Sequence, residues 1–218
     1  MLDQTDAKYW TPRPETLDYL VSLIPDGAKV LEVGPGLVPF PRATHFVDHH
    51  PGENIILCDV QRNPLPFPDK YFDFVYCRHV VEDIIYPLNF LTEMSRVAKA
   101  GYIETPSVLA EVCRGVDGGS PPWRGYNHHN WFVWNQNGKL KLLKKYPFVE
   151  YMQLNDDMID NIMRKSPVHW NTHLLWDGAI DFEQVIAGVI RPEYFGTITQ
   201  AVVDGVESTN RFVERYTH

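Results

Sequence analysis

Glycines and acidic side chains follow three apolar runs in the first third of the chain. KVLEVGPG ends in Gly34 and Gly36 after Glu32, THFVDHH carries Asp48, and NIILCDV carries Asp59. Glycine lets a backbone approach a ligand closely, while carboxylates can accept hydrogen bonds from a ribose diol or an adenine amine. In an open α/β sheet, ligands bind outside the carboxyl ends of the strands. The spacing therefore predicts a nucleoside site across neighbouring strand ends.

Two adjacent histidines, His128 and His129 in RGYNHHNWF, are candidates for a catalytic base. A neutral imidazole can take a proton from a hydroxyl or amine acceptor. The alternative is that both pack in their loop against Trp123, Tyr126 and Trp131. Adjacent histidines can also form a weak metal site, but no carboxylate or cysteine lies at ligand spacing nearby, so we predict no metal.

The elements that must position these residues alternate between strands and helices. Helical spacing predicts a helix from Pro14 to Ile24 and another after Pro87, while GYIETPS predicts a further buried strand. Such alternation implies an α/β fold whose mostly parallel sheet is covered on both faces.

After Ser107 the pattern changes to a long loop over 114–130 and two antiparallel hairpins. Asn137-Gly138 and Asp177-Gly178 supply the positive φ angles that two-residue hairpin turns need. Apolar spacing predicts a helix between the hairpins, from Phe148 to Ile162, and a terminal helix around 199–216.

We therefore predict a single domain over residues 1–218. Its core would span 28–107, and a loop- and hairpin-rich acceptor or cap region would span 108–190.

Bulk composition limits the partners. The net charge is −8 and no dense Lys/Arg stripe appears, which disfavours nucleic acid. No apolar run of 18 residues exists, so no membrane span is expected, and the polar, acidic first ten residues do not resemble a secretory signal. Three cysteines (Cys58, Cys77, Cys113) without a CxxC pair suit buried thiols in a reducing cytoplasm.

The strand-end motifs resemble those of class I S-adenosylmethionine-dependent methyltransferases. VLEVGPG is similar to their motif I, and VDHH to their second-strand motif. CDVQRNPLPFPDKYFDFVYCRHVVEDI resembles a stretch written D-x-x-x-LPFPD-x-x-FD-x-V in this family, and the likeness continues into GYIETP, over about residues 28–107. The resemblance implies a Rossmann-like, doubly wound fold with S-adenosyl-L-methionine as cofactor. It also implies methyl transfer to an oxygen or nitrogen of a small-molecule or glycan-type acceptor.

The same resemblance implies roles for the first two strand ends. Gly34 and Gly36 would line the methionine portion of the cofactor, Glu32 would support their loop, and Asp48 would bind the ribose hydroxyls. The alternatives are that the glycines only shape a tight turn and that Asp48 is a solvated strand-end carboxylate.

Asp59 and the Val60 backbone would hold the adenine, unless Asp59 only forms an Asx-type turn. Arg78 and His79, after the fourth strand, would face the transferred methyl group, Arg78 with the cofactor-binding set and His79 as a catalytic candidate. His79 could instead cap the following helix.

One departure from the family concerns the first crossover. Only 14 positions separate Gly34 from Asp48, and GPGLVPFPRA contains three prolines, which cannot sustain a helix interior. We therefore expect a short, largely non-helical crossover. S-adenosylmethionine has no phosphates and loses less than NAD would from the missing helix N-terminus.

Two other functions stay open on the sequence. One is a non-catalytic binding protein with the methyltransferase fold, and the other is an NAD-type nucleotide-binding enzyme. A homo-oligomer is also conceivable, since the hairpin edges could pair between subunits.

Overall fold

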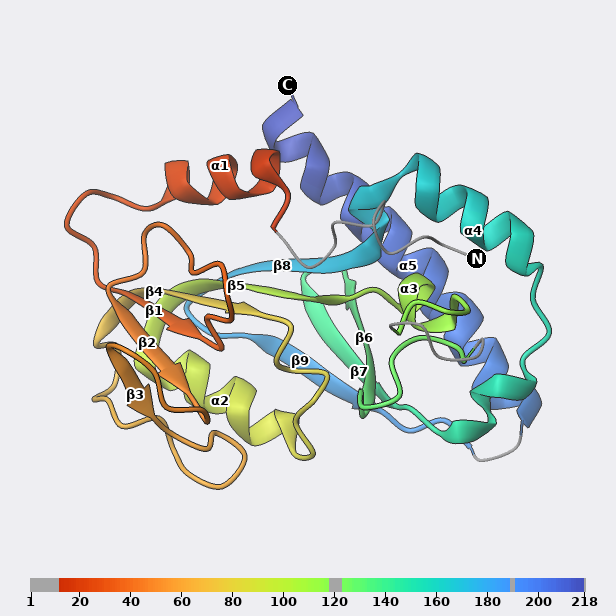
Figure 1. The fold of residues 1–218 in the computed structure, drawn as a ribbon, viewed down its shortest axis with the longest axis horizontal. Helices are drawn as coiled ribbons and strands as arrows, with labels where there is room; N and C mark the ends of the chain where they lie inside the picture. The colour runs from red at the N-terminus through yellow and green to blue at the C-terminus, as the bar shows by residue number, and fades with distance from the viewer. Residues whose placement is uncertain (1–11, 118–122, 189–190, 218) are drawn as a thin grey trace.

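The structure is a computed structural model that describes residues 12–117, 123–188 and 191–217. The polar N-terminal segment and residues 118–122 of the predicted long loop lie outside these ranges. Figure 1 shows an elongated molecule with β3 near one end and α4 at the other.

Six strands form the main sheet in the order β3-β2-β1-β4-β5-β8. Strands β1 to β5 pair in parallel and β8 is antiparallel to β5. This order confirms the predicted Rossmann-like, doubly wound and mostly parallel α/β fold. It reverses between β1 and β4, which is where such folds bind ligands. The strands span Val30–Val33 (β1), His45–Asp48 (β2), Ile55–Leu57 (β3), Phe72–Arg78 (β4), Ala98–Pro106 (β5) and Asn171–Asp177 (β8).

Helices cover both faces of the sheet at β4 and β5. On one face α2 (Pro87–Val97) buries Phe90, Leu91 and Met94. On the other, α1 (Pro14–Leu23) and the end of α5 (Arg191–Thr217) bring Leu20 and Phe212 into a second apolar cluster.

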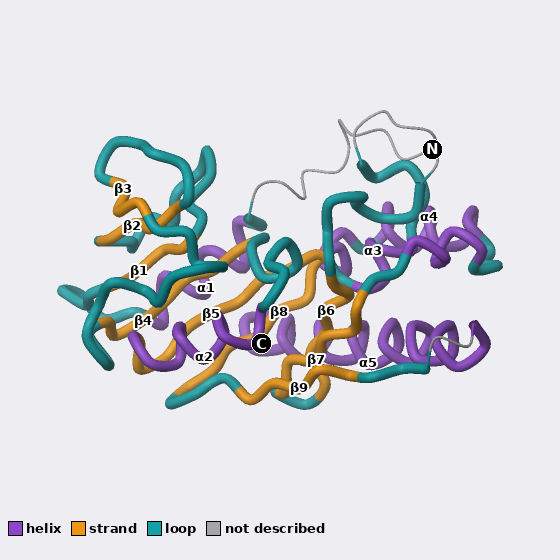
Figure 2. Tube along the Cα trace, turned by 90° about the horizontal axis from the view of Figure 1, so that it is seen from below, coloured by secondary structure: helices purple, strands orange, loops and turns teal. Residues whose placement is uncertain are grey.

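The expectation that both faces are covered throughout is wrong at the β2–β3 edge. No helix lies in the connections 34–44, 49–54 and 58–71, and Leu57 is 63% exposed. Figure 2 shows loops around these strands. The prediction of a short, non-helical first crossover is confirmed, and its prolines are the physical reason.

A second sheet has the order β6-β7-β9. Its strands are β6 (Trp131–Gln136), β7 (Lys139–Lys144) and β9 (Asp181–Val185). The first predicted hairpin, β6–β7, is confirmed, and both of its turn residues have positive φ, 55° at Asn137 and 88° at Gly138.

The second predicted hairpin is wrong. Both strands exist, but β8 pairs with β5 of the main sheet and β9 pairs in parallel with β7. The Asp177-Gly178 turn therefore carries the chain from one sheet to the other. β5 offers β8 a long partner, and Gly101 in β5 leaves room for Trp176, which a Cβ there would meet at 2.8 Å.

The helix predicted from Phe148 to Ile162 is also wrong as a single element. A 3-10 helix over Pro147–Tyr151 is followed by a break and then by α4 (Asp156–Lys165). Asn155 starts α4, because its side chain accepts a hydrogen bond from the Met158 N–H at 3.1 Å. The terminal helix α5 is longer than predicted, and α3 (Val108–Val112), a helix that the sequence analysis did not predict, precedes the predicted loop.

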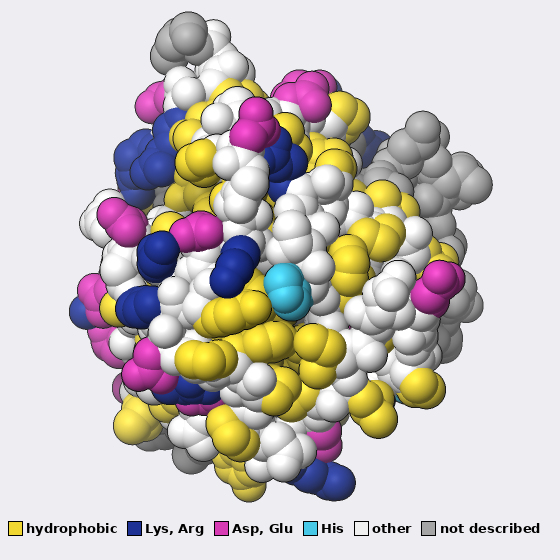
Figure 3. Space-filling view, turned by 90° about the vertical axis from the view of Figure 1, so that its left-hand side faces the viewer, with side chains coloured by type: hydrophobic (Ala, Val, Ile, Leu, Met, Phe, Trp, Pro, Cys, Tyr) yellow, Lys and Arg dark blue, Asp and Glu magenta, His cyan; other side chains and the backbone are white. Residues whose placement is uncertain are grey.

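The three cysteines are buried and free, which confirms the interpretation as structural thiols. Among the described helices, none combines the length and apolar character needed to cross a bilayer. Figure 3 shows lysine and arginine side chains interspersed with acidic ones and with apolar patches on the face at the β1–β3 end.

Candidate active site

Three predicted residues meet at the carboxyl ends of β1, β2 and β3. The Gly34 N–H donates to the Val47 carbonyl at 2.9 Å, and the Cys58 N–H donates to the Asp48 carbonyl at 2.9 Å. Main-chain bonds therefore place Gly34, Asp48 and Asp59 side by side, and we call these three residues the carboxyl edge.

The glycine loop meets the loop that follows β4. Gly34 has φ +72°, and a Cβ there would lie 2.6 Å from Cγ2 of Val80. The two loops at the point of strand reversal thus approach so closely that only glycine fits. Gly36 has φ +54°, and a Cβ at this position would meet nothing within 4 Å, so it lies open to solvent.

Glu32 holds the loop that contains Gly34 and Gly36 through a hydrogen bond to its far end. Its carboxylate accepts the Phe40 N–H at 2.8 Å, and the residue is 2% exposed. Burial raises the pKa of Glu32 to about 7, because the charged form is poorly solvated.

The two aspartates of the carboxyl edge also make local hydrogen bonds. Asp48 accepts the His50 N–H at 2.8 Å, and Asp59 accepts the Gln61 N–H at 3.1 Å in an Asx-type turn. A carboxylate offers about four lone-pair sites, so these bonds leave capacity for a ligand. Val60 is half-buried against the apolar core.

Arg78 is engaged by a buried carboxylate of β5. Its Nε donates to Glu104 at 2.7 Å, and Glu104 also accepts from the Tyr102 hydroxyl at 2.5 Å and the Asn171 amide at 2.9 Å. Burial alone would raise the pKa of Glu104, but His79 and the Arg78 charge bring that pKa well below its usual range. Arg78 thus acts first as the counter-ion of Glu104.

His79 is held in an uncommon backbone conformation at the end of β4. Its φ is +54°, and its N–H donates to the Glu104 carbonyl at 2.8 Å. The ring lies between two acids, with Nδ1 3.6 Å from Glu82 and Nε2 3.8 Å from Glu104. Burial lowers the pKa of His79, so its neutral form, a proton acceptor, dominates at neutral pH. Such strain in a non-glycine residue is typical of functional sites.

Glu82 is a buried acid that the sequence analysis missed. It is 1% exposed, and neither carboxylate oxygen has a hydrogen-bond partner. Burial, and then the charge of Asp83, raises the pKa of Glu82 well above its usual range. A carboxyl group whose charged form is disfavoured by burial therefore lies beside the His79 ring.

The loop that carries the histidine pair is tied to the loop after β4. Asn130 donates from its N–H to the Glu82 carbonyl at 2.8 Å and from its side chain to the Asp83 carbonyl at 2.9 Å. The Trp131 indole donates to the Ile84 carbonyl at 2.8 Å. These bonds bring the three predicted catalytic histidines to one side of the molecule.

His128 and His129 have different surroundings. The His128 side chain is 58% exposed, whereas that of His129 is 5% exposed. His129 Nδ1 lies 2.5 Å from Glu111, whose other oxygen accepts from the Lys145 ammonium. Burial opposes the charge on Glu111, but Lys145 and then His129 bring the pKa of this carboxyl below its ordinary value. The predicted packing of the loop aromatics is also present, because the ring centroids of Tyr126 and His129 lie 4.5 Å apart.

Glu82, Glu104 and Glu111, which we call the acidic interior, were missed because their partners are remote in sequence. A weak signal existed for two of them, since Glu104 and Glu111 are single charges within the apolar runs GYIETP and VLAEVC. A charge inside a buried run needs a partner, but the sequence does not identify that partner.

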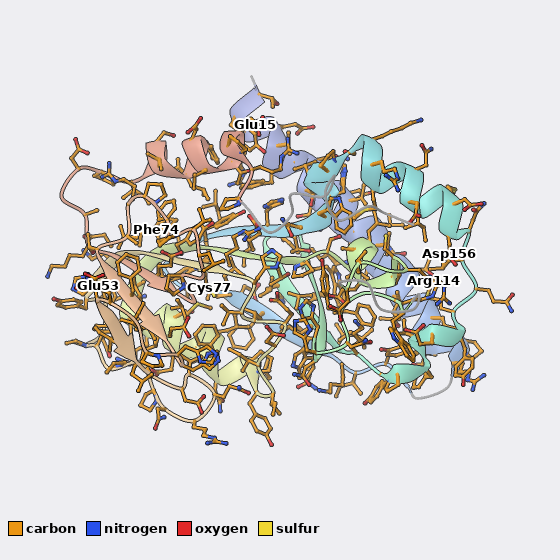
Figure 4. The ribbon with its side chains drawn as sticks, in the orientation of Figure 1. Glu15, Glu53, Phe74, Cys77, Arg114 and Asp156 are labelled. Atoms are coloured by element: carbon orange, nitrogen blue, oxygen red, sulfur yellow. The ribbon has the colours of Figure 1, made fainter. Side chains whose placement is uncertain are left out.

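A cavity of about 650 Å³ adjoins His129. Its lining is rich in aromatic side chains and also contains charged ones. The aromatic residues are Trp123, Tyr126, Tyr146, Phe148 and Tyr151, and the charged residues are Arg124, Lys145 and Glu150. Arg114 and Asp156 brace this end of the molecule through an ion pair of 3.1 Å, and Figure 4 shows them far from Glu53, with Cys77 between the two ends.

Residues 31–103 match the family model of the methyltransferase domain. Among curated proteins none matches this chain. Solved structures resemble parts of it. A methyltransferase of Thermotoga maritima is 20% identical over 43% of this chain and 50% of its own, with a TM-score of 0.34. One of Aquifex aeolicus is 19% identical over 56% and 80%, with a TM-score of 0.36. One of Mesorhizobium loti is 12% identical over 60% and 64%, with a TM-score of 0.35.

The chain thus spans about half the length of the first of these structures. Its strand order, its glycine-bearing first strand end and the family match agree with one another. Residues 31–103 are thus similar to a methyltransferase domain, and the strand order of the main sheet is that of a Rossmann-like fold.

Proposed function

We propose that this protein transfers a methyl group from S-adenosyl-L-methionine to an oxygen or nitrogen of a small-molecule or glycan-type acceptor. The observation that carries the proposal is the carboxyl edge, where main-chain bonds align Gly34, Asp48 and Asp59 along the ends of β1, β2 and β3, beside the point of strand reversal. The methyltransferase-domain match over residues 31–103 supports the same function.

The residues present fit this cofactor. The bare backbone at Gly34 and Gly36 suits the methionine portion, and Glu32 holds their loop through Phe40. Asp48 would accept from the ribose hydroxyls, and Asp59 with the Val60 backbone would hold the adenine. When bound, the cofactor supplies a methyl group on a sulfonium, a reactive centre that needs no protein nucleophile.

The remaining chemistry is orientation and proton removal. Arg78 and Glu104 fix the end of β4 and therefore the position of His79. His79, His128 and His129 would supply proton acceptors, and His129 lines the aromatic cavity. Of these, His79 is kept neutral by burial, which suits it to accept a proton from the acceptor as the methyl group moves.

The aromatic cavity beside His129 favours a small ring-bearing acceptor. Its stacking faces would hold a sugar or another ring, and Lys145 and Glu150 would bind polar substituents.

Calorimetric titration with S-adenosylmethionine and S-adenosylhomocysteine tests the cofactor assignment. The Asp48→Ala variant should lose at least about 100-fold in affinity, because it removes both hydrogen bonds to the ribose. Asp26→Ala, which removes a fully exposed carboxylate side chain, is the matched control and should bind normally. Unchanged affinity in Asp48→Ala would remove the ribose assignment, and binding of NAD in place of S-adenosylmethionine would overturn the proposed function. Labelled-methyl turnover on a panel of metabolites and glycans then separates catalysis from binding alone.

A further inference from the structure

Three metal-ligating side chains converge from two loops that lie far apart in the sequence. Asp83 follows β4, while His128 and His129 follow α3. Oδ1 of Asp83 lies 3.9 Å from Nε2 of His128 and 3.8 Å from Nε2 of His129, and all three ligand atoms lie within 4.8 Å of one another. A tetrahedral Zn²⁺ ion with bonds of about 2 Å has ligand atoms about 3.3 Å apart, so small side-chain rotations close this set around an ion.

The carboxylate oxygen at the centre of this group lacks a hydrogen-bond partner. Oδ1 of Asp83 is buried and accepts no hydrogen bond, whereas buried polar atoms in native proteins nearly always have one. Ring packing of His129 on Tyr126 explains the place of the imidazole but leaves this oxygen unexplained. A bound cation would satisfy it.

The hydrogen bonds behind His129 orient it as a metal ligand. Its Nδ1 lies 2.5 Å from Glu111, and Glu111 is held by Lys145 and by the Tyr126 N–H. A carboxylate in this position accepts the Nδ1 proton and leaves the lone pair on Nε2, the atom that faces Asp83. Carboxylate–histidine–metal arrangements of this kind fix the tautomer and ring orientation in zinc sites.

The close approach of the loop to Glu111 depends on one glycine. Gly125 has φ +61°, and a Cβ there would lie 2.5 Å from the Glu111 carbonyl oxygen. The loop thereby carries the histidine pair over α3 and toward Asp83.

We propose that Asp83, His128 and His129 bind one divalent transition-metal ion, with Zn²⁺ the best fit, and that Glu111 positions His129. Two imidazoles and one carboxylate suit Zn²⁺ and its first-row neighbours, whereas Mg²⁺ and Ca²⁺ prefer oxygen ligands alone. Asp83 and His128 are partly exposed, so an ion with three protein ligands keeps a position open to solvent or to an acceptor. The site does not depend on the proposed methyl transfer. When it is occupied, His128 and His129 bind the ion, and the role of proton acceptor falls to His79.

Calorimetric titration of the chelator-treated full chain with Zn²⁺ tests the proposal, with Co²⁺ absorption as a probe of geometry. The wild type should bind one ion, and Co²⁺ should give the intense visible bands of a four-coordinate site. His128→Ala and Asp83→Asn should each weaken Zn²⁺ binding by about 100-fold, and Glu111→Gln by about 10-fold or more. Because His128 is exposed, His128→Ala should fold even where a buried variant does not, and circular dichroism verifies this.

His50→Ala is the matched control, since His49 and His50 form the other adjacent histidine pair and are exposed. It should leave the main Zn²⁺ affinity unchanged. Binding that survives both His128→Ala and Asp83→Asn, binding lost only in His50→Ala, or no binding by the wild type would overturn the proposal. None of these readouts requires enzymatic activity, so the metal site can fail while the methyl-transfer proposal stands, and the reverse.

Discussion

The carboxyl edge is held by main-chain hydrogen bonds between neighbouring strands, whereas the acidic interior is held by side-chain bonds between segments far apart in the sequence. Asp48 keeps 18% of its side chain exposed, while Glu104 is 2% and Glu111 0% exposed. Because main-chain hydrogen bonds hold the carboxyl edge, its side chains can be substituted without loss of the backbone arrangement. A buried charge that loses its partner cannot be rescued by water. Substitutions should therefore affect ligand binding at the edge and folding in the interior.

The largest effect expected is the loss of Glu104. Glu104→Ala removes a buried carboxylate that accepts hydrogen bonds from Arg78, Tyr102 and Asn171. We expect the free energy of unfolding to fall by about 3–5 kcal/mol, the usual cost of breaking a buried ion pair. Urea denaturation measures this loss, and Asp48→Ala, at the carboxyl edge, should cost less than about 1 kcal/mol. Equal losses in the two variants would contradict the contrast between the regions.

A pH-dependent effect is expected at Glu32, which lies under the edge but is itself buried. Its pKa rises from 4.5 to about 7 on folding. Between these values the folded chain keeps a proton that the unfolded chain has lost, so Glu32 makes stability fall as pH rises through this window. Glu32→Gln removes this slope and can still accept the Phe40 N–H.

The glutamine variant should therefore match the wild type near pH 4 and exceed its stability by about 3 kcal/mol at pH 8, since 2.5 pKa units at 1.36 kcal/mol each set that scale. Denaturation midpoints measured from pH 4 to 8 would show it. If the stability of the two proteins changed with pH in the same way, the pKa of Glu32 would not rise on folding, and the prediction would be wrong.

The smallest effect separates close packing from backbone strain. Gly125→Ala places a Cβ against the Glu111 backbone, whereas Gly138→Ala, at the β6–β7 turn, has the same sign of φ and nothing within 4 Å. Both variants carry the cost of positive φ, about 1 kcal/mol. Gly125→Ala should lose about 2 kcal/mol more through overpacking. Thermal unfolding of the pair measures the difference, and equal losses would show that the loop moves away from α3 without cost.

The elements of the first half were largely predictable, because their signals are local. The alternation of apolar runs and the prolines of GPGLVPFPRA determine strand ends and a non-helical crossover without reference to remote residues. The β6–β7 hairpin was predictable for the same reason, since Asn137-Gly138 joins strands that pair with each other.

The Asp177-Gly178 turn shows that local sequence signals do not predict which strands pair. Its residues fit a hairpin equally well, yet β8 pairs with β5 and β9 with β7. A turn motif reports local φ angles, whereas the pairing partner is chosen by the buried surface that each free sheet edge offers.

The sequence alone determined the parallel α/β core and the order of glycine and aspartates along its carboxyl edge, because strand periodicity and turn chemistry act over a few residues. Tertiary structure alone decided that Glu104 neutralises Arg78, that Glu111 orients His129, and that Asp83 faces the histidine pair. These contacts join residues 18 to 46 positions apart. Their energies depend on burial and on the distance between charges, which exist only once the chain has packed.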